Sequence, residues 1–275
     1  MTKIYVLDQN YLRSDELKTL IVDEPQAKFV LPDIALLEMC KGDKWRETMQ
    51  GSLETLAQIP GRVMQSMSVG EALRGELANV KSIEGRLLPK DLTQFVRSIM
   101  RDVASNDHSG PGVTLISKSI QKAQEEIRNQ ELDHGRNQLS LRTRTDIIKS
   151  ALGNEHLRKL KNGTVPDDVR LDVIKSVSND LVRTFLSSEG HSPNRIKSFL
   201  KTKPLMLRFY LLSVRHTFEW AKSGGLESYP AEKVTNDIID QDYVAIASFF
   251  DGIKTRENRV NEADQDMRKL LRMWR

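Results

Sequence analysis

The chain has a single cysteine and no long hydrophobic run. Cys40 cannot form an internal disulfide, and its neighbours Leu36, Leu37 and Met39 predict that the thiol is buried. No segment approaches the roughly 18 consecutive apolar residues that a membrane span requires. The N-terminus begins at once with a strand-like segment. We therefore expect neither a signal peptide nor a membrane anchor, and a reducing cytoplasm as the location of the protein.

Several motifs of known chemistry are also missing. None of the histidines has zinc-ligand spacing with another histidine or with the cysteine. They are His108, His134, His156, His191 and His216. The chain has no Gly-rich phosphate loop, Walker motif or GxSxG sequence, which disfavours P-loop enzymes and α/β-hydrolases. His216 lies beside Arg215 in a predicted helix, where we expect a structural or surface role rather than that of a base.

Charge of one sign is not in large excess, but it is unevenly distributed. The net charge is +4 over 275 residues. Residues 61–203 hold 24 Lys and Arg against 17 Asp and Glu, a balance of +7, whereas the two ends together hold 18 against 21, a balance of −3. A basic middle segment suits a polyanionic partner, although a solvated helical surface explains the excess almost as well.

The N-terminal residues alternate short apolar runs with amphipathic segments. This pattern predicts an α/β fold, with a parallel sheet covered by helices. Ser14 is the expected N-cap of the first helix. The expected strands are 3–8, 28–31 and 63–67, and the expected helices are 14–22, 33–40 and 44–58.

From about residue 70 to 200 the pattern changes to successive helices with little strand character. We therefore divide the chain into a first core part at 1–67, a helical insertion at 68–203 and a second core part at 204–275. The insertion helices are expected at 70–82, 90–104, 113–132, 142–161, 166–187 and 192–201. The second core part is expected to contain helices at 204–222, 238–250 and 261–273, and a strand at GIKT.

Acidic residues lie inside or directly after apolar stretches that are far apart in the sequence. Asp8 ends the run IYVL, Glu38 lies in FVLPDIALLEM, Asp237 and Asp240 open NDIIDQDYVAIASFF, and Glu257 closes GIKTRE. A carboxylate after an apolar strand, or one turn into an apolar helix, points out of the end of the core. Converging carboxylates repel one another unless a cation lies between them, and Mg²⁺ and Mn²⁺ prefer oxygen ligands. The pattern favours metal-dependent cleavage of a phosphodiester.

Three of these segments resemble those of the PIN-domain nucleases. LDQNYL, with Asp8 and Asn10, resembles the first strand of that family. VLPDIALLEM resembles its second segment, in which Glu38 would supply the second carboxylate. NDIIDQDYVAIASFFDGIKTRE resembles its third and fourth segments, an acid-headed helix followed by a strand that ends in Thr-x-Asp. The resemblance covers residues 1–65 and 205–260 and implies a PIN-like parallel-sheet core.

The resemblance also implies roles for individual residues. Spacing to the last strand favours Asp240 as the third acid, with Asp237 as a further metal ligand or a helix N-cap. Glu257 stands where the family has Asp, so its side chain is one methylene longer. Thr255 and Asn10 are expected to orient carboxylates or phosphate through hydrogen bonds.

A PIN-like enzyme would use Mg²⁺ or Mn²⁺ held by Asp8, Glu38, Asp237, Asp240 and Glu257 to hydrolyse RNA, or single-stranded DNA. The resemblance implies a toxin, an antiviral defence effector or an RNA-processing enzyme. An inhibitory or regulatory protein partner could restrain its activity, and the protein could form homo-oligomers. Basic residues of the insertion could bind the RNA backbone. They are Arg142, Arg144, Lys149, Lys159, Lys161, Lys201 and Lys203.

Two alternatives from other classes stay open. Arg101 and His108 have the Arg-x6-His spacing of HEPN ribonucleases, all-helical dimers that cleave RNA without metal. The other alternative is a module that binds nucleic acid or protein and whose carboxylates have lost their metal. Chelation separates the first alternative from a metal-dependent nuclease, and substrate cleavage separates the second.

Overall fold

A computed structural model describes most of the chain. The described residues are 2–40, 42–105, 110–116, 146–147, 149–150, 154–155, 158–159, 162–222 and 231–274, the side chains of 231–235 excepted. The helices predicted at 113–132 and 142–161 therefore lie largely outside the described residues.

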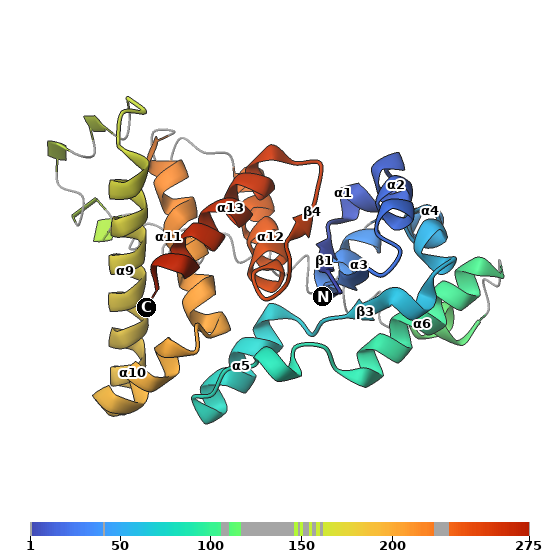
Figure 1. Cartoon of the computed structure of the whole chain (residues 1–275), viewed down its shortest axis with the longest axis horizontal. Coiled ribbons are helices and arrows are strands. Elements are labelled where there is room, and N and C mark those ends of the chain that lie inside the picture. The colour runs from blue at the N-terminus through green and yellow to red at the C-terminus, as the bar shows by residue number, and fades with distance from the viewer. Residues whose placement is uncertain are drawn as a thin grey trace.

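The centre of the fold is a parallel sheet of four strands in the order β3-β2-β1-β4 (Figure 1). The strands are β1 (Ile4–Leu7), β2 (Lys28–Leu31), β3 (Val63–Gln65) and β4 (Ile253–Lys254). The expected parallel α/β arrangement is confirmed, because β1 pairs in parallel with both β2 and β4. The strand near the C-terminus thus joins the strand at the N-terminus.

The strands form where the sequence places apolar residues on both faces of the sheet. Val6, Leu7, Phe29, Val30 and Leu31 are fully buried, as in a parallel sheet covered on both sides. The neighbouring helices are α1 (Gln9–Leu12), α2 (Asp15–Asp23), α3 (Asp33–Met39) and α4 (Trp45–Ala57).

Local capping explains where α2 begins. The Ser14 hydroxyl accepts a hydrogen bond from Leu17 N at 3.3 Å, so the predicted N-cap is confirmed. Asp15 and Glu16 occupy the first turn of the helix, where negative charge is favoured by the helix dipole.

The middle of the chain is helical where it is described. It contains the short 3-10 turns η1 (Pro60–Arg62) and η2 (Glu84–Arg86) and the helices α5 (Val69–Asn79), α6 (Lys90–Ala104), α9 (Asp167–Ser188), α10 (Pro193–Lys201) and α11 (Leu205–Lys222). Helix α6 packs against β3 and α4, whereas α9 packs against α11. Figure 1 accordingly places α4 and α6 at one end of the molecule and α9 and α10 at the other.

The two C-terminal helices begin earlier than predicted. Helix α12 (Ala231–Ala247) starts seven residues before the predicted residue 238, and α13 (Asn258–Met273) starts three residues before the predicted residue 261. Asp237 therefore lies within α12, and the prediction that it caps this helix is wrong. The segment AEKVT continues the helical pattern in the N-terminal direction, because Ala, Glu and Lys favour helix.

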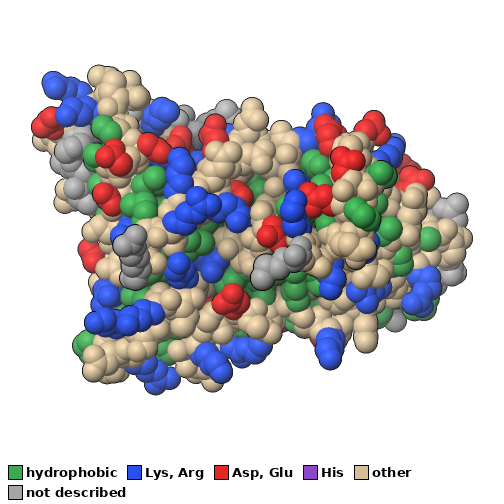
Figure 2. All heavy atoms as spheres, viewed as in Figure 1, with side chains coloured by type: hydrophobic (Ala, Val, Ile, Leu, Met, Phe, Trp, Pro, Cys, Tyr) green, Lys and Arg blue, Asp and Glu red, His purple; other side chains and the backbone are tan. Residues whose placement is uncertain are grey.

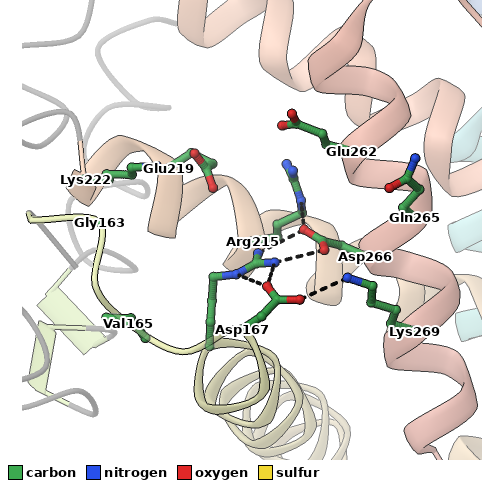
Figure 3. A pocket seen from close by; sticks show the side chains of 11 residues that line it. Gly163, Val165, Asp167, Arg215, Glu219, Lys222, Glu262, Gln265, Asp266 and Lys269 are labelled. Carbon is green, nitrogen blue, oxygen red and sulfur yellow. Dashed lines mark hydrogen bonds and ion pairs between the residues drawn. The ribbon is translucent and has the colours of Figure 1, made fainter. Parts of the chain in front are cut away.

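A buried ion network joins α9, α11 and α13 (Figure 3). Asp266 accepts hydrogen bonds from both terminal nitrogens of Arg170, each at 2.9 Å, and from Arg215 Nε at 2.8 Å. Asp167 in turn pairs with Arg170 and with Lys269. Burial opposes the charge of Asp266, but the two arginines hold the pKa of its carboxyl below the ordinary value. The network therefore holds α9, α11 and α13 together.

Candidate functional site

The strand order creates a switch point between β1 and β4. From β1 the chain runs outward to β2 and β3 on one side, whereas β4 lies on the other side of β1. In open α/β sheets, ligands bind outside the carboxyl ends of the strands at such a point. Asp8 directly follows β1, and Thr255 and Glu257 follow β4. The sheet therefore positions two of the predicted carboxylates on either side of the switch point.

A continuous hydrogen-bond network links the residues after β1 to those after β4. The Thr255 hydroxyl donates to Asp8 Oδ2 at 2.5 Å and accepts from Glu257 N at 3.1 Å. Asn10 donates from Nδ2 to Glu257 Oε1 at 2.9 Å and accepts from Arg256 N on Oδ1 at 3.0 Å. Thr255 and Asn10 thus each hold one of the predicted acids in place.

Asp8 is buried and carries a perturbed carboxyl group. Its residue exposure is 5%. Burial, followed by the repulsion of Glu38 and Glu257, raises the pKa of Asp8 to about 6, although the hydrogen bond from Thr255 acts in the opposite direction. Burial disfavours the charged form, and nearby carboxylates disfavour it further.

Helix α12 brings a second perturbed carboxyl group to the same place. Burial raises the pKa of Asp240 to about 8, with added repulsion from Glu257, Asp8, Asp237 and Glu38. Perturbed carboxyl groups of this kind cluster at functional sites. The predicted acids from the two ends of the chain therefore interact electrostatically with one another.

Glu38 is held by a residue that the sequence analysis did not single out. Tyr243 of α12 donates its hydroxyl hydrogen to Glu38 Oε2 at 2.6 Å. Burial, together with the negative charge of Glu38, raises the pKa of Tyr243 well above its ordinary value, so the phenol stays protonated as the donor. Asp240 and Tyr243 are three residues apart, a spacing that places both on one helix face and could have indicated the role of Tyr243.

The carboxylate of Asp237 forms its hydrogen bonds with residues outside the group of predicted acids. It is 2% exposed, and its carboxylate accepts hydrogen bonds from Trp220 Nε1 at 2.8 Å and from Arg259 at 3.0 Å. These bonds tie α12 to α11 and α13. No local pattern predicts these bonds, because the partners lie on separate helices.

Four acids of the site have the ligand atoms that a hard divalent cation prefers, but their side chains are not arranged around a common point. Asp8, Glu38, Asp240 and Glu257 supply carboxylate oxygens, the ligands that Mg²⁺ and Mn²⁺ prefer. Within the described part of the chain, however, no group of three or more His, Cys, Asp or Glu side chains is arranged so that it could hold a metal ion.

Other predicted groups are only partly described. Arg101 lies exposed on α6, but His108, its partner in the HEPN interpretation, lies outside the described residues. The basic residues Arg142, Arg144 and Lys161 also lie outside them. His216 is buried beside Trp220, and burial together with Arg215 and Arg259 lowers its pKa to about 3. His216 is thus a neutral core residue.

The raised carboxyl pKa values predict a pH-dependent effect of Asp240→Asn on stability. Between the ordinary Asp pKa near 4 and the folded value of about 8, the native state binds more protons than the unfolded state, so this group destabilises the fold as pH rises. The melting temperature of Asp240→Asn should be close to that of the parent at pH 4.5 and above it at pH 8.5. Thermal melts across this range in buffer with EDTA would measure the difference, with Asp23→Asn, an exposed acid at the end of α2, as the control. A difference that does not change with pH would contradict the prediction.

Comparisons with known proteins give no relative for this chain. No protein-family model matches it, and searches of curated proteins and of solved structures found no significant match. Among the described residues, no helix is both long enough and apolar enough to cross a membrane.

Proposed function

We propose that this chain is a divalent-metal-dependent nuclease that cleaves RNA. The observation that carries the proposal is the electrostatic interaction among Asp8, Glu38, Asp240 and Glu257, which come from both ends of the sequence, beside the switch point of the sheet. Burial raises the pKa of Asp8 and of Asp240, and the negative charge of the neighbouring acids raises both further. A bound cation would offset this repulsion, which gives the site a physical reason to take one.

The residues of the site have separate parts in the proposed reaction. Asp8, Glu38, Asp240 and Glu257 would hold Mg²⁺ or Mn²⁺, with Asp237 as a further ligand only if it leaves Trp220 and Arg259. Thr255, Asn10 and Tyr243 orient the carboxylates through the hydrogen bonds described above. When bound, such an ion lowers the pKa of a water molecule and stabilises charge on the phosphate. No covalent protein nucleophile is required.

The proposed PIN-like identity rests on the sequence motifs together with the strand order. The order β3-β2-β1-β4 places the carboxyl end of β1 beside that of β4, as the motifs require if their acids are to meet. A toxin or defence effector that acts on RNA, restrained by a protein partner, is the biological role that we attach to this proposal.

A second candidate is a protein that binds RNA without cutting it. It is favoured by the excess of 24 Lys and Arg over 17 Asp and Glu in residues 61–203, which suits a polyanionic partner. The two candidates share a substrate and differ in catalysis.

The experiment that separates them is cleavage of labelled RNA and single-stranded DNA in the presence of Mn²⁺, Mg²⁺ or EDTA. Cutting of RNA that requires metal supports the nuclease. Binding without cutting supports the second candidate. Cutting that survives EDTA contradicts both and directs attention to Arg101 and His108.

A further inference from the structure

A groove of about 710 Å³ lies at the opposite end of the molecule from α4 and α6. It is formed by one face of α9, by α10 and by the residues at the end of α13. In Figure 1, α12 and α13 lie between this region and the strands that carry Asp8 and Glu257. The groove is therefore separate from the carboxylate site.

The charges that line the groove are predominantly positive. Among the described residues that line it, four are basic, Lys175, Arg183, Lys197 and Lys201, and one is acidic, Asp172. Lys175 and Arg183 are eight residues apart on α9, a span of roughly 12 Å along the helix. Lys197 and Lys201 lie on consecutive turns of α10. Figure 2 shows blue Lys and Arg side chains gathered over this lower-left part of the surface.

These cations are not neutralised by neighbouring carboxylates. Lys175, Lys197 and Lys201 form no ion pair with any described residue, and Arg183 donates from Nε to the neutral Asn179 at 2.9 Å. By contrast, the pocket between α9, α11 and α13 contains four acids against four bases, and several of them are paired (Figure 3). The groove therefore keeps an uncompensated positive field, which attracts a polyanion.

An aromatic residue lies at the end of the positive groove. Trp274 follows α13 and is half-buried, and with Met273 it lines the groove. Grooves that combine cations along a backbone path with an exposed aromatic face are typical of single-strand nucleic-acid binding, because bases stack on the ring whatever their identity. A polyanionic protein segment would use the cations but has no bases to stack on the indole.

We propose that this groove binds single-stranded RNA, with its phosphates on Lys175, Arg183, Lys197 and Lys201 and a base stacked on Trp274. The inference rests on the proposed function in that it names a second contact surface for the same substrate. In this proposal, α9 and α10 bind one part of the RNA strand, at a distance from the carboxylates that would cut another part of it.

Binding of a labelled single-stranded RNA oligomer, measured in EDTA so that metal-dependent cutting is prevented, tests the proposal. The double variant Lys197→Ala/Lys201→Ala should bind roughly tenfold more weakly. The slope of log K against log salt concentration should become less steep by about 1.4, because each of the two lost phosphate contacts accounts for about 0.7 of the slope on single strands. The matched control is Lys81→Ala/Lys90→Ala, which removes the same charge from exposed positions outside the groove. Equal weakening in both double variants would overturn the proposal.

Stacking is tested separately with Trp274→Ala and Trp274→Phe. The alanine variant should bind roughly 5- to 150-fold more weakly, the range expected for loss of one stacked base, and the phenylalanine variant should retain most of the affinity. Circular dichroism melts show whether each variant is folded. Equal affinity of the two folded variants would overturn the stacking contact.

One further outcome tests the occupant of the groove, and two others separate this inference from the proposed function. Displacement of the RNA by polyglutamate at equal charge concentration would overturn RNA as the occupant. RNA binding that depends on the groove, without metal-dependent cleavage, would support the groove and contradict the nuclease. Metal-dependent cleavage that is unchanged in the groove variants, with unchanged RNA affinity, would support the nuclease and contradict the groove.

Discussion

Asp8→Asn is expected to lower the rate of metal-dependent RNA cleavage by roughly 10²- to 10⁴-fold. A metal-bound site supplies several kcal/mol of transition-state stabilisation, and each 1.36 kcal/mol corresponds to a factor of ten in rate. Asp8 is the acid at the carboxyl end of β1, and the repulsion of Glu38 and Glu257 acts on it. An amide in its place keeps the shape but removes the charge that would hold the ion.

The same substitution should not damage the fold. Asn at position 8 can still accept the hydrogen bond that Thr255 donates to Asp8, and it removes a buried charge. Its melting temperature in EDTA at pH 8 should equal or exceed that of the parent. The control is Asp23→Asn, which should cut at the parental rate. An Asp8→Asn protein that is folded and cuts at the parental rate would remove Asp8 from the site.

Glu76→Ala should lower the free energy of unfolding by roughly 3–5 kcal/mol, because it would leave buried N–H groups without an acceptor. Glu76 of α5 is fully buried. Its Oε1 accepts from Ile83 N and Leu205 N, and its Oε2 accepts from Met206 N, each at 2.9 Å. A single carboxylate thus caps the N-terminus of α11 and anchors the loop after α5.

Urea unfolding of Glu76→Ala, compared with Glu71→Ala, measures this effect. Glu71 lies exposed in the first turn of the same helix, so its loss should cost less than about 1 kcal/mol. Glu76→Gln should fall between the two, because the amide keeps one acceptor oxygen. A Glu76→Ala protein within 1 kcal/mol of the parent would show that the three N–H groups find other partners.

Local sequence patterns predicted the elements whose cause is local. The mostly buried runs of β1 and β2 stand out as apolar stretches, and Ser14 has the residue type and position of an N-cap. Helix α6 begins and ends as predicted at 90 and 104. The apolar runs and the capping hydroxyl are recognisable within a few residues of sequence, although the partners of β1 in the sheet lie far away in the chain.

Features that depend on distant contacts could not be predicted in this way. Glu76 is a polar residue in an amphipathic helix, and its partners at 205 and 206 lie more than a hundred residues away. Asp237 was predicted as a cap or a ligand, but its bonds to Trp220 and Arg259 depend on how three helices pack. The early start of α12 also escaped detection, because the acidic motif at 236–240 resembles a helix start.

The candidate site lies between these two cases. The strand-end position of Asp8 and the Thr255-x-Glu257 motif are visible in the sequence. The hydrogen bonds from Thr255 to Asp8 and from Asn10 to Glu257 are not, because they form only when β1 and β4 lie side by side in the sheet. Tyr243 was missed because tyrosine in an apolar helix is usually a core residue.

The most direct test of the central claim is the binding of Mn²⁺ at pH 8, measured by electron paramagnetic resonance. The parent should bind one or two ions per chain, and Asp8→Asn, Glu38→Gln, Asp240→Asn and Glu257→Gln should each weaken that binding at least tenfold, while Asp23→Asn leaves it unchanged. A parent protein that binds no Mn²⁺, or binding that all four substitutions leave intact, would contradict the claim that these carboxylates form one metal site.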